Sequence, residues 1–173
     1  MVQAEHGPHG AAWLIAWDED VIDAVGREVA DLVAASPRRA DVEATLTDGG
    51  YAALVDGPEA AMAVVNAVAP EHLQLMTAEP DALLTGVRHA GAIFCGPLAP
   101  ASVGDYAAGP SHVLPTDGSA RFSSALSVYD FLRQQHVVRV DRAGFEAVGP
   151  VVEVLAEAEG LDAHAASIRV RRT

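Results

Sequence analysis

The chain has 173 residues, of which 50% are hydrophobic and 20% charged, so it is large enough for one ordinary domain with a small appendage and is not a disordered chain. Its 24 acidic residues outnumber 11 basic ones for a net charge of −13, which argues against a nucleic acid or an anionic membrane as partner. All the basic residues are arginine, and the absence of lysine excludes a Schiff-base or phosphate-loop lysine.

Strands and helices are predicted to alternate along the first part of the chain. Residues 11–17 form a short, continuous apolar run, which is typical of a strand buried on both faces. Asp18 is expected to cap a helix that carries apolar residues at helical spacing and ends before Pro37. The next predicted elements are a helix at 38–46, a strand at 51–56, a helix at 58–69, a strand at 72–77, a helix at 81–89 and a strand at 90–95.

Glycine and proline run through residues 96–117, which we predict to be one long functional loop. Beyond the loop, the pattern predicts a helix at 127–134, a short extended piece at 136–140 and helices at 151–159 and 161–169. The alternation in the first part predicts an α/β fold with a mostly parallel sheet. Residues from about Ser127 onward are expected to form a small helical tail domain.

Three places in this first part concentrate side chains that bind metals or move protons. Gln3 and His6 are three residues apart and would share a face on a helical turn, although a solvated terminus explains them too. Glu71 and His72 lie where a helix gives way to a strand, and either an acid–base pair or a histidine that stabilises the helix end fits them. Asp105 and His112 lie in the long loop, where an ordinary surface loop is the alternative.

A fourth cluster lies in the tail and consists of Glu157, Glu159 and His164, for which a solvated acidic helix is the simpler interpretation. The chain contains no HExxH, CxxC or GxGxxG motif, so no short zinc or dinucleotide motif is present. Cys95 is the single cysteine, which excludes an intrachain disulfide and favours a reducing, cytoplasmic location. No apolar run approaches the roughly 20 residues that span a bilayer, and the first residues do not resemble a signal peptide.

Several long stretches together resemble the histidinol dehydrogenase family. They are QAEHGP at 3–8, APEHLQLMT at 69–77, AGAIFCGPLAPASVGDYAAGPSHVLPT at 90–116, ARFSSALSVYDF at 120–131 and AEAEGLDAHA at 156–165. The resemblance covers nearly the whole chain but only the C-terminal portion of such an enzyme. It implies an incomplete, doubly wound Rossmann-like sheet at 1–126 with the metal and catalytic residues, and a helical dimerisation domain at 127–173. Ser111 departs from the family, whose loop usually has asparagine before the histidine.

The family oxidises L-histidinol to L-histidine through the aldehyde, with NAD⁺ as the oxidant and zinc as a required metal. The resemblance implies that zinc is held by Gln3, His6, Asp105 and His164, the last from the other subunit of a homodimer. His72 would be the general base and Glu71 would activate water, while His72, His112, Glu159 and the four zinc ligands would bind histidinol. Nitrogen and oxygen ligands of this kind suit zinc or manganese.

The resemblance places no NAD-binding residue in this chain, because the family binds most of its NAD through an N-terminal Rossmann-like domain. The chain could therefore be a fragment or a split subunit that works with a separate N-terminal half. Two alternatives remain open at this point: a catalytically inactive zinc-binding or dimer-forming remnant, and a related zinc alcohol dehydrogenase that acts on another polar alcohol.

Overall fold

The structure is a computed structural model that describes residues 1–7 and 10–172. The chain divides into two compact units, Met1–Phe131 and Leu132–Thr173, which are described separately below. None of the helices in the described residues is long and apolar enough to cross a membrane.

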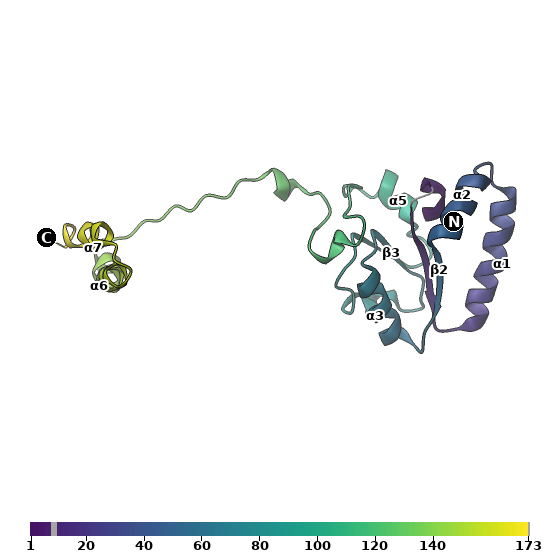
Figure 1. The fold of residues 1–173 in the computed structure, drawn as a ribbon, viewed down its shortest axis with the longest axis horizontal. Coiled ribbons are helices and arrows are strands. Elements are labelled where there is room, and N and C mark those ends of the chain that lie inside the picture. Colours follow the sequence, from purple (N-terminus) through teal and green to yellow (C-terminus); the bar gives the residue numbers. More distant parts are fainter. Residues whose placement is uncertain (8–9, 173) are drawn as a thin grey trace. The chain divides into compact units, whose positions relative to one another are not determined.

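The first unit opens with a strand–helix–helix–strand arrangement (Figure 1). Strand β1 (Ala12–Ala16) pairs in parallel with β2 (Gly50–Leu54). The connection between them consists of α1 (Glu19–Ala35) and α2 (Arg39–Gly49), which lie on the opposite side of the strand pair from the next helix, α3 (Pro58–Val68). As predicted, Asp18 caps α1, because its side chain accepts a hydrogen bond from the Asp20 amide at 3.0 Å.

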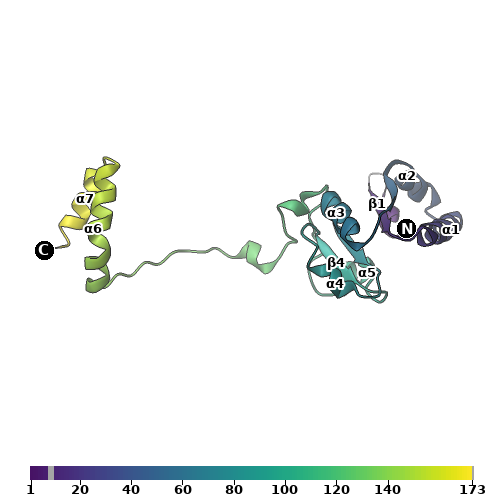
Figure 2. The ribbon, with the colours of Figure 1, turned by 90° about the horizontal axis from the view of Figure 1, so that it is seen from below.

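A second parallel pair follows and is built in the same way (Figure 2). Strand β3 (His72–Leu75) pairs with β4 (Ala92–Cys95), and the short helix α4 (Pro80–Leu84) connects them. A buried cluster of Val65, Leu73 and Leu75 packs α3 against β3. These two pairs confirm the predicted α/β class and the parallel direction of its strands, and each forms its own two-stranded sheet.

Three sequence predictions are corrected in the first unit. The segment 96–117 is not one loop, because it contains helix α5 (Ala101–Tyr106), which begins directly after Pro100. The helix predicted at 81–89 ends at Leu84. The helix predicted at 127–134 is wrong, since only a single 3₁₀ turn, η3 (Val128–Phe131), forms there. Two further 3₁₀ turns are η1 (Gln3–His6) and η2 (Ser119–Arg121).

The second unit is a helical hairpin that follows an irregular segment at 132–141. Helix α6 (Arg142–Ala158) begins well before the predicted residue 151, and α7 (Asp162–Arg169) follows it. The prediction failed because Gly149 and Pro150 have the composition of a helix end, whereas both lie inside α6. Gly149 is buried, and a side chain there would meet Ile168 of α7 at 3.3 Å, so the glycine permits the close packing of the two helices.

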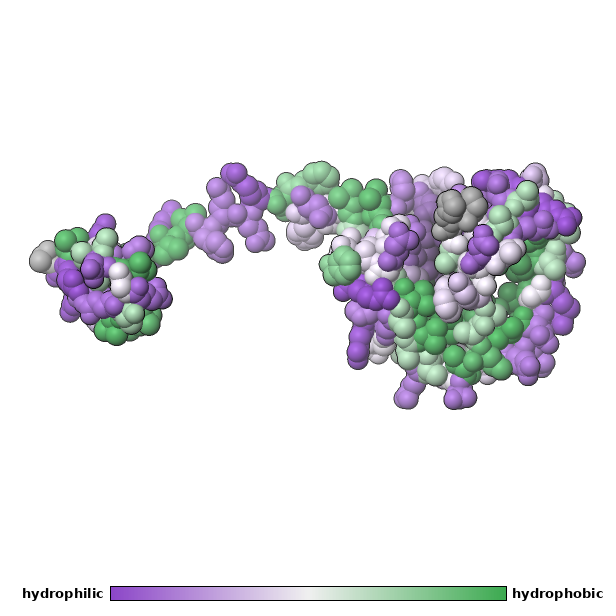
Figure 3. All heavy atoms as spheres, in the orientation of Figure 1, coloured by the Kyte–Doolittle hydropathy of each residue, from purple (hydrophilic) through white to green (hydrophobic). Residues whose placement is uncertain are grey.

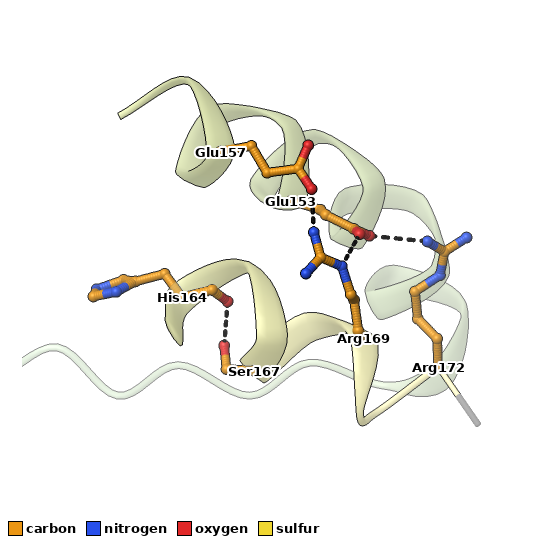
Figure 4. Close-up of polar contacts among 6 residues, drawn as sticks. All are labelled: Glu153, Glu157, His164, Ser167, Arg169 and Arg172. Atoms are coloured by element: carbon orange, nitrogen blue, oxygen red, sulfur yellow. Dashed lines mark hydrogen bonds and ion pairs between the residues drawn. The ribbon is translucent and has the colours of Figure 1, made fainter. Parts of the chain in front are cut away.

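Charged side chains also link the two helices of this hairpin (Figure 4). Arg169 of α7 donates to Glu153 of α6 at 2.5 Å and also to Glu157, and Arg172 donates to Glu153 at 3.1 Å. The Arg169 hydrogen bond, with the nearby charges of Arg169 and Arg172, lowers the pKa of the Glu153 carboxyl below its usual 4.5. The outer side of α6 remains apolar, and Figure 3 shows hydrophobic atoms at the surface of both units. The exposed apolar residues of α6 are Val148, Val151, Val152, Val154 and Leu155.

Candidate functional site

Glu71 and His72 lie at the start of β3, where the end of α3 and two hydrogen bonds fix the position of the backbone. Helix α3 ends at Ala69, which has a left-handed conformation with φ of 52°. Arg121 of η2 donates to the Ala67 carbonyl at this helix end, a favourable position for a cation. The Ala92 amide of β4 then donates to the Glu71 carbonyl at 2.8 Å. Glu71 and His72 are therefore fixed between the end of a helix and a parallel strand.

The His72 side chain is nearly buried, with 9% of its surface exposed. Its Nε2 atom lies 3.4 Å from Oδ1 of Asp105 on α5, yet neither ring nitrogen forms a hydrogen bond. Polar atoms that are buried without a hydrogen bond are rare, and a catalytic role is one explanation for them. Residues 72 and 105 were both predicted as site residues, and the structure brings them together.

Phe94 of β4 supports this pair from one side. Its ring centroid lies 5.8 Å from that of His72 in a tilted arrangement. A Cβ atom at Gly104 would lie 2.5 Å from the Phe94 ring, so a larger residue there would have to displace the ring that packs against α5 next to Asp105. The sequence analysis did not select Phe94, because an aromatic residue in an apolar strand has the pattern of any core residue.

Gln3 and His6 share the 3₁₀ turn η1, close to the helical turn that was expected. His6 is exposed, whereas Gln3 is half-buried and its Nε2 atom is buried without a hydrogen-bond partner. Within the described residues, neither side chain forms a hydrogen bond or ion pair with another candidate residue. Pro8, the last residue of the motif at 3–8, lies outside the described part of the chain.

His112 lies after α5 in an exposed stretch without helix or strand. Ser111, the departure from the family pattern, accepts a hydrogen bond from the Val113 amide at 3.2 Å and so forms a local turn around His112. The serine hydroxyl can therefore organise this turn without an asparagine amide.

Glu159 and His164 belong to the second unit, and both are exposed. His164 lies in the first turn of α7, where its backbone carbonyl accepts a hydrogen bond from Ser167 at 2.7 Å (Figure 4). Its imidazole points away from the arginine–glutamate cluster of the hairpin. Glu157, the third member of the tail cluster, is paired with Arg169.

The described residues contain no group of three or more His, Cys, Asp or Glu side chains that could hold a metal ion. Gln3, His6 and Asp105 contain only two residues of those four types, so such a group would need at least one further His, Cys, Asp or Glu. The chemistry best supported by geometry is proton transfer at His72, since a buried imidazole beside a carboxylate can accept and return a proton.

The sequence model of the histidinol dehydrogenase family matches residues 1–172. The chain is 47% identical over 169 residues to the histidinol dehydrogenase of Dechloromonas aromatica strain RCB, covering 98% of this chain and 39% of the relative. It is 48% identical to that of Moorella thermoacetica, covering 99% of this chain and 40% of the relative. The crystal structure of histidinol dehydrogenase from Elizabethkingia anophelis superposes with a TM-score of 0.95 at 33% identity, covering 98% of this chain and 39% of that one. The chain therefore spans about two fifths of the length of these relatives.

Proposed function

The chain belongs to the histidinol dehydrogenase family, and we propose that it forms the metal-binding and proton-transferring part of an enzyme that oxidises L-histidinol to L-histidine with NAD⁺. The observation that carries the proposal is the family match over residues 1–172, which includes every candidate residue described above. Its geometric support is the buried His72 beside Asp105. A cytoplasmic location and a role in histidine biosynthesis belong to the same proposal.

We assign the proton transfers of the reaction to Glu71 and His72. His72 takes the proton of the alcohol, which prepares the carbon to give up its first hydride to NAD⁺. Glu71 would then take a proton from the water that adds to the aldehyde, and loss of a second hydride to NAD⁺ and of a hydroxyl proton to a base would leave the carboxylate. The burial of His72 suits this role, because a base that is shielded from bulk water exchanges protons with the bound substrate rather than with the solvent.

We propose that Gln3, His6, Asp105 and His164 hold one zinc ion. The donor chemistry fits, since imidazole nitrogens, a carboxylate and an amide oxygen are all zinc ligands. Zinc, when bound, would hold and orient the imidazole and amino groups of histidinol. All four ligands would contact the substrate, together with His72, His112 and Glu159.

We further propose a homodimer in which residues 127–173, which contain the hairpin of α6 and α7, provide the dimer contact and His164 completes the zinc site of a second copy. Residues 1–126 would then carry the remaining metal and catalytic groups. NAD would bind chiefly to a separate N-terminal part that corresponds to the other three fifths of the relatives. The exposed imidazole of His164 and the apolar outer side of α6 support this arrangement.

The proposal is tested by NADH formation from histidinol, with the 173 residues alone and with the remaining region of a relative added. We expect turnover only in the mixture. In the mixture, His72→Asn should abolish NADH formation, and Glu71→Gln should stop the reaction at the aldehyde. The matched control is His89→Asn, which changes a half-buried histidine and should remain active. Absence of histidinol-dependent NADH from every combination would contradict the function, and fast turnover by the 173 residues alone would contradict the division of labour.

A further inference from the structure

Thr45 is the one polar residue that is fully buried in the part of the chain that the structure describes. It lies on α2, and its Oγ atom is 2.5 Å from the Gly7 carbonyl oxygen and 3.1 Å from the Asp41 carbonyl oxygen. A hydroxyl has one proton to donate, and the shorter distance favours Gly7. Burial of a hydroxyl is costly unless it is hydrogen-bonded, so this bond to a distant segment fixes two elements relative to each other.

The segment that Thr45 holds is the end of η1, the turn that carries Gln3 and His6. A single 3₁₀ turn of four residues cannot hold its own conformation, and no side chain caps its start. Its position comes from α2 and α1 instead. Ala4 is fully buried against Val33 and Val42, which anchors the middle of the turn.

A second contact anchors the chain beyond η1. A Cβ atom at Gly49 of α2 would overlap the Gly10 carbonyl oxygen, so the two backbones touch at this point. The Gly10 amide also donates to the Gly7 carbonyl at 3.3 Å, the same oxygen that Thr45 binds. Gly7 directly follows His6, so the two hydrogen bonds to the Gly7 carbonyl restrain the backbone next to His6.

From these contacts we propose that Thr45 is a positioning residue for the metal donors Gln3 and His6 and acts through the Gly7 carbonyl. This inference rests on the proposed zinc site and adds the residue that orients part of it. Groups that orient metal ligands typically alter metal affinity by about 10- to 100-fold when they are lost. Thr45 would belong to this class although it touches no metal itself.

The test is the zinc affinity of the 173-residue chain, measured by competition with a chromophoric chelator. Thr45→Val keeps the shape of the side chain and removes the hydroxyl, and we expect it to weaken zinc binding about tenfold. Thr45→Ser keeps the hydroxyl and should bind within about twofold of the parent. Thr47→Val is the matched control, because Thr47 lies on the same helix, is exposed, and its hydroxyl donates to the Glu43 carbonyl of its own helix at 2.7 Å. Equal affinity of Thr45→Val and the parent, or equal weakening by Thr47→Val, would overturn the inference.

Hydrogen exchange at the Gly10 amide gives a second readout that does not depend on zinc. We expect faster exchange in Thr45→Val than in Thr47→Val or Thr45→Ser, because the carbonyl that accepts this amide would lose its second anchor. Unchanged exchange in Thr45→Val would overturn the inference by itself. Failure of the parent chain to bind zinc would instead count against the proposed function.

Discussion

The two units of the chain carry their candidate residues in opposite environments. In Met1–Phe131, the His72 ring is nearly buried, its nitrogens lack hydrogen bonds, and Asp105 and Phe94 surround it. In Leu132–Thr173, Glu159 and His164 are exposed and the helices are joined by surface ion pairs. In the first unit, burying these ring nitrogens without hydrogen bonds costs free energy, which the surrounding packing must offset. In the second unit, the Glu159 and His164 side chains are exposed and free of such a cost.

The strongest test of this comparison removes one metal donor from each unit. If the site draws on both, His6→Ala and His164→Ala should each weaken zinc binding by at least about 100-fold, since both remove a direct ligand. The control is His136→Ala, which removes an exposed histidine from the second unit. Zinc content is measured by atomic emission after gel filtration. Retention of zinc by the His164 variant alone would mean that the second unit does not contribute a ligand.

Close packing in the first unit predicts the next largest effect. Gly49→Ala should destabilise the protein by about 1–3 kcal/mol, because the new methyl group would overlap the Gly10 carbonyl oxygen in a place that has no room to adjust. Gly26→Ala is the matched control in α1, where nothing lies within 4 Å of the new methyl group. It should stabilise the helix by about 0.5–1 kcal/mol. Both free energies of unfolding come from denaturant titration, and equal values for the two variants would show that the close approach at Gly49 does not constrain the fold.

The smallest predicted effect concerns the ion pairs of the second unit and their dependence on pH. The folded pKa of Glu153 is lowered below its usual 4.5, chiefly by the hydrogen bond from Arg169. The stabilisation it provides is therefore present above pH 4.5 and is lost as the pH falls through the lower, folded pKa. At about pH 6, the amides of α7 should exchange faster in Glu153→Gln than in the parent. The difference should shrink as the pH falls through the folded pKa of Glu153, and a difference that does not change with pH would rule out the carboxylate charge as its origin.

The sequence predicted the strands of the first unit from their apolar composition. The burial expected on both faces of the strand at 11–17 is incomplete, because Trp13 of β1 is 42% exposed and Tyr51 of the neighbouring β2 is 48% exposed. Helix α5 was missed because it has six residues and no apolar periodicity, and its start depends on Pro100. The first half of α6 was missed because Gly149 and Pro150 suggest a break, and only the contact with Ile168 explains why glycine is suitable there. Local composition cannot report such a contact between helices.

The candidate residues were found by motif, whereas their arrangement was not predictable. Nothing in the spacing of residues 72 and 105 places them together, because their approach depends on how α5 packs against Phe94. The same holds for Thr45, whose role is visible only from its bond to Gly7. Residue types indicate which side chains can bind metals or transfer protons, whereas tertiary packing determines which of those side chains lie close together.

The irregular segment at 132–141 has a practical consequence because the chain contains no lysine. Trypsin can cut this protein only after arginine, and two arginines, Arg133 and Arg139, are exposed in that segment. The arginines of the first unit lie in helices or turns, or in a backbone anchored by Asn66, whose side chain accepts from the Arg88 amide at 2.7 Å. Brief digestion should therefore cut first after Arg133 and Arg139, since proteases act on exposed irregular segments. One fragment would retain Gln3, His6, His72 and Asp105, and the other Glu159 and His164, so a single protease would sort the candidate donors into two separately testable sets.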